Sequence, residues 1–217
     1  MPVVDKHSLL SQLTSRSPVI LELGCGTRKR HDGSIGIDAI DYESVDIVAD
    51  AMDALRAFPS ASVDFITSTH FLEHVDDVGA ILDEMIRIVR AGGRIEVIVP
   101  HFAHPYFSSD PTHRRPFGLY TFSYFAMDGV FRRGVPAYSR RAELRLQTVD
   151  LVFKSTRPFY ARHAIKRVVG WLFNSCRYMQ ELYEENFCYL FPCYEIRFVL
   201  ERVEPREARA RDKSRAG

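Results

Sequence analysis

Three histidines and one aspartate stand close together in a single short segment of this chain. His101, His104, Asp110 and His113 fall within 13 residues, among prolines that prevent a continuous helix. Imidazole groups beside a carboxylate are suited to proton transfer near neutral pH. We therefore predict a general base here, with His113 and His104 as the first candidates, Asp110 as its orienting partner and His101 as the third candidate.

The same four side chains leave two other interpretations open. Imidazole and carboxylate groups are common ligands of divalent metal ions, so the set could form a metal site. Spacing along a loop does not enforce ligand geometry, and we predict no metal. Alternatively, each histidine only caps a turn and fixes the loop.

A second group of residues indicates a nucleoside-binding site near the N-terminus. Val19–Leu23 is a mostly apolar run that leads into Gly24-Cys25-Gly26, and a second apolar run ends at Asp38. Two glycines one residue apart allow a sharp turn and a close approach of backbone to ligand. A carboxylate at the end of the next strand can accept hydrogen bonds from a ribose.

The residues around this turn argue against a dinucleotide as the ligand. The dinucleotide fingerprint requires a third small residue where this chain has Lys29. The segment from Thr27 to Ser34 is too short and too polar for a full crossover helix, whose N-terminus would bind a pyrophosphate. An acid, Glu22, also precedes the glycines. The pattern therefore favours a nucleoside cofactor without a pyrophosphate.

Hydrophobic periodicity indicates the elements that must position these residues. Apolar runs alternate with helical patterns, which is typical of an α/β fold with a parallel sheet. The expected elements are a helix at 5–13, strands at 19–23, 35–38, 45–51 and 62–69, a helix that ends at Gly92 or Gly93, strands at 92–100 and 144–153, a helical segment at 161–189 and a last strand at 194–203.

The run Glu22-Leu23-Gly24-Cys25-Gly26 resembles motif I of the class I S-adenosylmethionine (SAM)-dependent methyltransferases of the type 11 group. The segments 45–51, 62–69, 72–75 and 92–100 resemble later motifs of that family in order and spacing, so the resemblance covers roughly 19–128. It implies a Rossmann-like three-layer sandwich with a seven-stranded, mostly parallel sheet and an antiparallel last strand. It also implies an enzyme that converts SAM to S-adenosylhomocysteine.

The resemblance assigns residues to each part of SAM. Those expected are Glu22, Gly24, Cys25 and Gly26 at the amino-acid end, Asp38 at the ribose, Asp50 and Ala51 at the adenine and Thr69 on the floor of the site. The connection from the first strand to the second is unusually short for the family. We expect it to lack most of the first helix and to leave SAM more exposed.

Two features suggest the methyl acceptor. The run from Ser109 to Gly118 resembles members of the family associated with polysaccharide and glycan gene clusters. Arginines, whose forks bind anions, are concentrated nearby, at Arg114, Arg115, Arg132, Arg133, Arg140, Arg141 and Arg145. We predict O-methylation of a sugar or other hydroxyl-bearing, anionic small molecule. The alternatives are N-methylation of a small amine, a non-catalytic SAM-binding scaffold and, for the arginines, a solvated basic face.

Composition sets the remaining expectations. The 217 residues carry a net charge of +1, which predicts no general attraction to nucleic acid or membrane. The four cysteines form no CxxC pair and no apolar run is long enough to span a bilayer, so we expect a cytoplasmic protein. We expect one methyltransferase domain over 1–203, with a substrate loop at 101–141, an aromatic lid or partner surface, including a homodimer face, at 159–190, and a disordered tail at 204–217.

Overall fold

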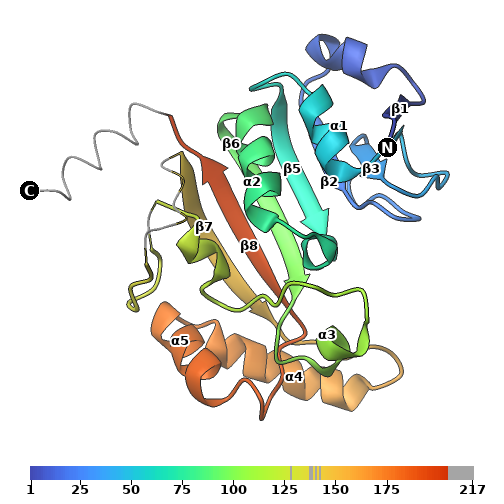
Figure 1. Cartoon of the computed structure of the whole chain (residues 1–217). Helices are drawn as coiled ribbons and strands as arrows, with labels where there is room; N and C mark the ends of the chain where they lie inside the picture. The colour runs from blue at the N-terminus through green and yellow to red at the C-terminus, as the bar shows by residue number, and fades with distance from the viewer. Residues whose placement is uncertain (128, 137–138, 140, 142, 205–217) are drawn as a thin grey trace, which may run out of the picture.

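The computed structural model describes residues 1–127, 129–136, 139, 141 and 143–204 of the chain. Its centre is an eight-stranded sheet with the order β1-β4-β3-β2-β5-β6-β8-β7 (Figure 1). The strands are β1 (Val4–Asp5), β2 (Ile20–Leu23), β3 (Ile35–Asp38), β4 (Ile47–Val48), β5 (Val63–Thr69), β6 (Val89–Pro100), β7 (Leu144–Val152) and β8 (Glu195–Arg202).

The strand directions confirm the predicted seven-stranded arrangement. Strands β2 to β6 pair in parallel, whereas β8 is antiparallel to both of its neighbours, β6 and β7. An additional short strand, β1, pairs antiparallel with β4 at the edge of the sheet. The last strand is therefore the one reversed strand among the seven, as expected.

The N-terminal segment differs from the helix expected at 5–13. After β1 the chain forms a 3-10 helix, η1 (Leu9–Ser15). Asp5 nevertheless caps this turn, because its carboxylate accepts hydrogen bonds from the backbone N–H groups of Leu9 (2.9 Å) and Leu10 (2.8 Å).

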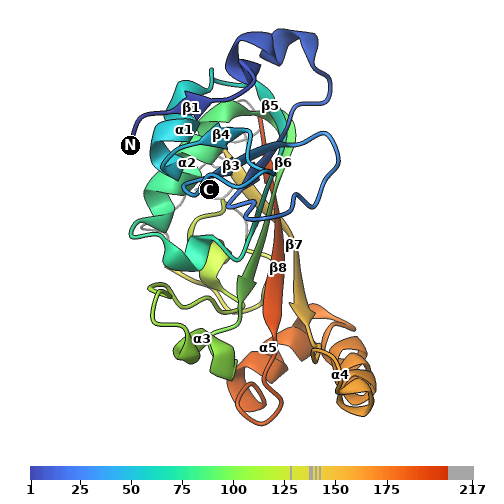
Figure 2. The same ribbon diagram turned by 90° about the vertical axis from the view of Figure 1, so that its right-hand side faces the viewer.

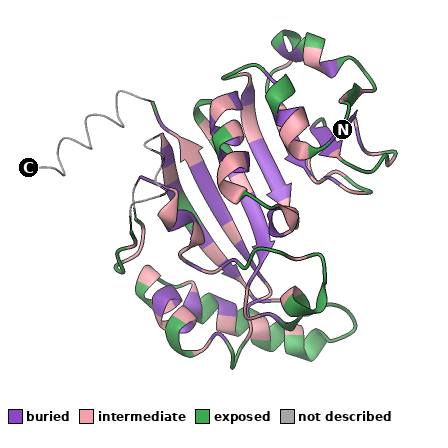
Figure 3. Cartoon of the chain, viewed as in Figure 1, coloured by how far each residue is buried: buried purple, intermediate pink, exposed green. Residues whose placement is uncertain are grey.

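Helices α1 (Ala51–Ala57) and α2 (Val78–Ile88) lie on the same face of the sheet (Figure 2). The buried side of α2 includes Leu82 and Met85, which belong to one apolar core with Val97 of β6 and Phe198 of β8. The central strands are accordingly mostly buried (Figure 3). Helix α2 ends at Ile88 and β6 begins at once, so the two glycines lie inside the start of the strand instead of ending the helix.

The opposite face of β6, β8 and β7 carries charged side chains in a ladder. Arg197 of β8 donates to Glu96 of β6 at 2.5 Å and to Asp150 of β7 at 3.5 Å. Further along the same two strands, Arg145 of β7 and Glu201 of β8 form a second ion pair at 3.3 Å. In Figure 2 no helix of the described chain packs along this part of the sheet. Because side chains alternate along a strand, the apolar ones lie on one face of the sheet and the paired charged ones on the other.

The first connection, 24–34, forms turns and no helix, as predicted from its length and polarity. Glu22, which is buried at the end of β2, holds this loop by accepting from the backbone N–H of Arg30 at 2.9 and 3.0 Å. His31 then packs edge-on against Phe65 of β5, with ring centroids 5.3 Å apart. The loop therefore covers the sheet where a helix would otherwise lie.

The segment after β6 and the segment between β7 and β8 gather at the carboxyl end of the parallel strands (Figure 1). The elements there are η2 (Leu72–His74), α3 (Pro105–Ser109), η3 (Thr121–Tyr124), α4 (Tyr160–Phe173) and α5 (Arg177–Asn186). The predicted helical segment at 161–189 thus corresponds to two helices. The expected disordered tail, apart from its first residue, and Arg140 of the arginine group lie outside the described residues.

Candidate active site

A cavity of about 340 Å³ opens at the carboxyl ends of β2, β3 and β4. Ligands of open α/β sheets bind at this edge. Its lining includes four residues that the sequence assigned to the cofactor, Gly24, Asp38, Asp50 and Ala51. It also includes apolar side chains suited to a nucleobase, among them Ile37, Met52, Phe71 and Ile81.

Gly24 requires glycine for two reasons. Its φ is +67°, in the left-handed region that other residues rarely adopt. A Cβ built on Gly24 would also stand 2.8 Å from the Cβ of Phe71. The turn can therefore bring its backbone close to the cavity only with glycine at this position.

Asp38 combines a structural role with its place in the cavity wall. Its carboxylate accepts from the backbone N–H of Gly26 at 2.9 Å and of Ile40 at 3.0 Å. Each carboxylate oxygen can accept more than one hydrogen bond, so capacity for a ribose diol remains. The carboxylate is thus oriented by the glycine turn that it also stabilises.

Carboxylates dominate the polar part of the cavity wall. Asp38, Asp50, Asp76 and Asp77 all line it. Asp50 and Asp77 cap the starts of α1 and α2 by accepting from Met52 and Ala80, and Asp76 pairs with Arg114. A wall of this charge favours a cationic ligand and opposes the phosphates of a dinucleotide.

The other four residues expected around SAM lie outside the lining of this cavity. Glu22 is directed to the first connection, and Cys25 is buried with its Sγ against Gly36. Gly26 contributes its N–H to Asp38, and the Thr69 hydroxyl accepts from the guanidinium of Arg30 at 2.7 Å. In the structure these residues shape the walls and the neighbouring loop.

A second pocket, of about 300 Å³, adjoins the cavity. His74 lines both, so the two spaces meet at its side chain. The other lining residues are mostly polar or aromatic and comprise His70, Glu73, Pro100, His104, Tyr106, Asp110, His113 and Tyr194. Three of the four predicted catalytic residues are thus brought together in one pocket.

The contacts of His113 leave one ring nitrogen suited to accept a proton. Its Nδ1 lies 2.9 Å from the carbonyl oxygen of Phe107, so Nδ1 must carry the hydrogen. In the neutral ring, Nε2 then bears the lone pair. Nε2 lies 3.7 Å from Asp110 and 3.9 Å from Glu73, at the pocket side of the ring. Phe107 also stacks on the His113 ring, with centroids 5.3 Å apart.

The other two histidines of the predicted base group are placed differently. Burial lowers the pKa of His104 to about 4, with Lys166 and His101 adding to the effect. Its Nδ1 accepts from the backbone N–H of Tyr106 at 3.3 Å, so the neutral ring carries its hydrogen on Nε2 and has no free lone pair for a proton. His101 is fully buried, donates to Glu184 at 2.9 Å and does not line the pocket. The geometry therefore favours His113.

Two further pocket residues, His70 and Glu73, were not among the predicted catalytic residues. His70 adopts φ +52°, an uncommon conformation for a residue other than glycine. Its ring bridges two buried carboxylates, Glu195 at 3.0 Å and Glu73 at 3.3 Å. Hydrogen bonding to Glu195 and then Glu73 raises the pKa of His70 to about 9. The pocket therefore contains a fixed imidazolium, which the sequence pattern His-x-x-Glu-His alone did not reveal.

This bridge predicts a specific loss of stability at alkaline pH. A folded pKa of about 9 for His70, above the usual 6.5, stabilises the fold fully below pH 6.5 and no longer above pH 9. Urea unfolding between pH 6.5 and 9 should show a falling free energy of unfolding in the wild type. His70→Asn, which tolerates the same backbone conformation, should flatten that slope; an unchanged slope would contradict the assignment.

Among the residues that the structure describes, one cluster has the composition and spacing to hold a metal ion. Ligand atoms of Glu73, His74 and His113 all lie within 4.8 Å of one another. Two imidazoles and a carboxylate form a ligand set used by zinc and non-haem iron. The set considered from the sequence is not assembled, because His101 is turned to Glu184. The predicted absence of a metal stays a prediction, and it is tested below with His113.

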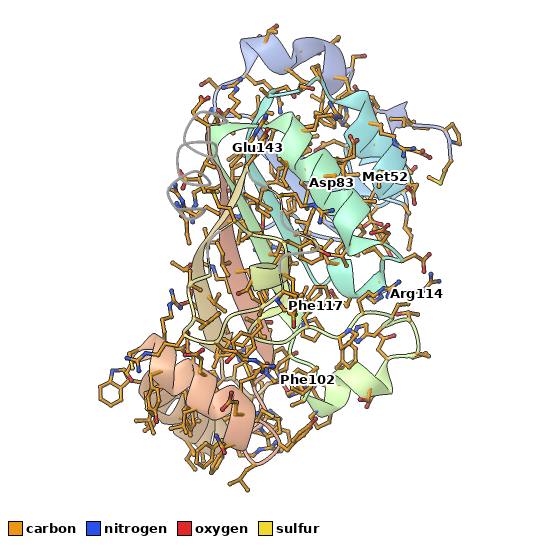
Figure 4. The ribbon with its side chains drawn as sticks, turned by 60° about the vertical axis from the view of Figure 1, so that its left-hand side comes forward. Met52, Asp83, Phe102, Arg114, Phe117 and Glu143 are labelled. Atoms are coloured by element: carbon orange, nitrogen blue, oxygen red, sulfur yellow. The ribbon has the colours of Figure 1, made fainter. Side chains whose placement is uncertain are left out.

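Most arginines of the predicted anion-binding group are engaged elsewhere. Arg114 pairs with Asp76, Arg141 with Asp83 of α2, and Arg145 with Glu201. Figure 4 shows Asp83 on α2 and Arg114 on the loop beneath that helix. Arg132 and Arg133 lie over the rings of Tyr178 and Tyr120. The three ion pairs agree with the alternative of a solvated basic face balanced by acids elsewhere in the fold.

Comparisons with known proteins agree with this geometry. Residues 21–97 match the family described as a methyltransferase domain. No curated protein sequence matches the chain significantly.

Solved structures share the fold at low sequence identity. A SAM-dependent methyltransferase from Archaeoglobus fulgidus aligns with a TM-score of 0.54 and 16% identity, over 91% of this chain and 94% of the other. A chain in the complex of the Haloferax volcanii Trm112 methyltransferase activator with the putative methyltransferase gives 0.52 and 15%, over 89% and 88%. The matched segment and the shared architecture show that this chain has the Rossmann-like fold of the class I methyltransferases.

Proposed function

We propose that this protein transfers the methyl group of SAM to a hydroxyl group of a small-molecule acceptor, such as a sugar. The observation that supports this most directly is the shared wall at His74. It joins a cavity suited to a cationic nucleoside to a pocket that contains a base with its lone pair accessible. The resemblance of 109–118 to glycan-associated relatives supports a sugar acceptor.

The residues divide the chemistry between positioning and proton transfer. SAM supplies a methyl group on a positively charged sulfur, which becomes a neutral thioether when the methyl is displaced in line. The chain holds both reactants at the His74 junction, which provides much of the rate. His113 Nε2 takes the proton of the acceptor hydroxyl as the new oxygen–carbon bond forms. Asp110, 3.7 Å away, stabilises the imidazolium that results.

The charges of the site support the cofactor. SAM carries a net charge of +1 at neutral pH, so the carboxylates of the cavity wall attract it. The ion pairs of the arginines offer little support for an anionic acceptor, so we infer a neutral hydroxyl compound. The same pairs favour neither nucleic acid nor a phosphorylated substrate.

Calorimetric titration tests the first half of this proposal. SAM and S-adenosylhomocysteine should bind with micromolar affinity, and NAD should not bind measurably because its phosphates meet the carboxylate wall. Transfer of labelled methyl to a panel of sugars, other alcohols and amines then tests the acceptor. Turnover of amines alone would replace O-methylation by N-methylation, and binding without any turnover would indicate a scaffold.

A further inference from the structure

Helix α4 (Tyr160–Phe173) presents an apolar surface to solvent. Ile165 is 63% exposed, Val168 67%, Trp171 77% and Leu172 47%. Figure 3 shows most of this helix in the colour of exposed residues. Single exposed apolar residues are common on proteins, whereas a contiguous group on one helix marks a binding surface.

Helical geometry shows that these side chains form one stripe. At about 100° per residue, one arc of about 140° contains the exposed apolar side chains of α4, which are Tyr160, Trp171, Val168, Leu172 and Ile165. The opposite side of α4 joins the fold through Gly170 and Phe173, which are both buried. The Phe173 ring packs against the ring of Tyr183 of α5, with centroids 5.1 Å apart. The outward stripe is therefore not the side by which α4 joins the protein.

Positive charge flanks the apolar stripe without acidic partners. The segment 151–180 contains no aspartate or glutamate, but it contains Arg157, Arg162, Lys166 and Arg167. Among the described residues none of these four cations forms an ion pair with a carboxylate. Arg162 and Arg167 fall at the two edges of the stripe on the helical projection. An outward apolar stripe between unpaired cations is typical of helices that lie in a membrane interface.

We propose that α4 binds the surface of an anionic phospholipid bilayer, with its axis in the plane of the interface. The apolar stripe would enter the boundary of the acyl chains while the flanking cations reach the lipid phosphates. Trp171 and Tyr160 have the amphipathic rings that favour this depth. None of the helices within the described ranges is long and apolar enough to cross a bilayer.

Charge complementarity distinguishes a bilayer from a second copy of the chain. A two-fold contact through this stripe would bring Arg162 and Arg167, which lie at its edges, close to the cations at the edges of the partner's stripe, with no acid in 151–180 to offset them. An anionic lipid surface supplies the missing opposite charge. The expectation of no membrane partner rested on a net charge of +1, which conceals this local concentration of cations.

The position of α4 agrees with an enzyme that works at such a surface. Helices α3 and α4 lie at the same end of the molecule in both views (Figures 1 and 2), and the loop between α5 and β8 lies there too. That loop adds three exposed apolar residues, Tyr189, Leu190 and Phe191. The pocket with His104 and Tyr106 is formed from this end of the sheet. The acceptor pocket and the proposed membrane surface therefore lie at the same end of the molecule (Figure 1).

Trp171 is the sole tryptophan of the chain, which makes the test direct. Full-length protein is mixed with vesicles of phosphatidylcholine alone or with about 30% phosphatidylglycerol, and both tryptophan emission and co-flotation are measured. We expect a blue-shifted emission and flotation with the anionic vesicles, and at least tenfold weaker binding to the neutral ones. Unchanged emission and no flotation with anionic vesicles would overturn the proposal.

Matched variants locate the surface. Val168→Asp and the pair Arg162→Glu/Arg167→Glu should each weaken binding at least tenfold, whereas Val4→Asp and Arg56→Glu, exposed at the far end of the molecule, should not. Unaltered thermal unfolding and cofactor affinity would show that the variants fold. A stable dimer by light scattering that Val168→Asp converts to monomer would assign the stripe to a second copy and overturn membrane binding. Because the readout is lipid binding, either result is independent of the proposed methyl transfer.

Discussion

Replacing His113 by glutamine is expected to lower kcat by about 10²–10⁴-fold and to leave the dissociation constant for SAM within about twofold. Glutamine retains a polar group that can reach Phe107, but it has no nitrogen that can take a proton at neutral pH. His113 lines the second pocket and not the cofactor cavity, so cofactor affinity should persist. Steady-state kinetics with the best acceptor, together with calorimetry, measures both quantities.

His7→Gln serves as the control for this variant, because His7 is exposed near the N-terminus and should have no effect on turnover. Near-normal turnover of His113→Gln would remove the base from the mechanism. The metal alternative is tested on the wild type. Loss of activity on dialysis against a chelator, restored by zinc or manganese, would make His113 a ligand with Glu73 and His74 instead.

Replacing Asp38 by alanine should weaken SAM binding by roughly 10- to 100-fold, which corresponds to losing about 1.5–3 kcal/mol of charge-assisted hydrogen bonding. The effect includes two parts, because the carboxylate both faces the cavity and accepts from Gly26 of the glycine turn. Calorimetric titration of the purified variant with SAM and with S-adenosylhomocysteine measures the loss.

Two comparison variants separate these parts. Asp38→Asn keeps one oxygen for the backbone contacts and should fall between the wild type and the alanine variant. Asp41→Ala removes a nearby carboxylate that is paired with Lys6 and lies outside the cavity lining, so it should bind SAM normally. Wild-type affinity in Asp38→Ala would mean that another residue holds the ribose.

Seven of the eight strands could be predicted from the sequence because each of them has a local signal, whereas the two-residue strand β1 has none. Periodicity indicates runs such as Ile35–Ile37 and the alternating Leu144, Leu146, Val149 and Leu151, and the family resemblance supplies the mostly parallel directions of the strands. The glycine turn and Asp38 were identified for the same reason, since the strand, the glycines and the acid are adjacent in sequence.

The parts that sequence could not supply depend on contacts across the fold. Glu195 lies 125 positions from His70, and nothing local to either residue indicates their 3.0 Å contact. His101 and His113 look equivalent in the sequence, and only Glu184 and Phe107 distinguish a buried structural imidazole from an accessible one. For α4, its aromatic residues gave the signal for a surface, but which side faced outward depended on the packing of Phe173.

The charged ladder on β6, β8 and β7 also bears on how the sheet finds its register. Val97 and Phe198 enter the core, while their neighbours Glu96 and Arg197 pair with each other on the opposite face of the sheet. A slip of either strand by one residue would exchange these roles, so charges would enter the core at the same moment that apolar residues left it. A register shift would therefore cost free energy on both faces of the sheet at once. The face without helices thus specifies the pairing of the strands as much as the packed face does.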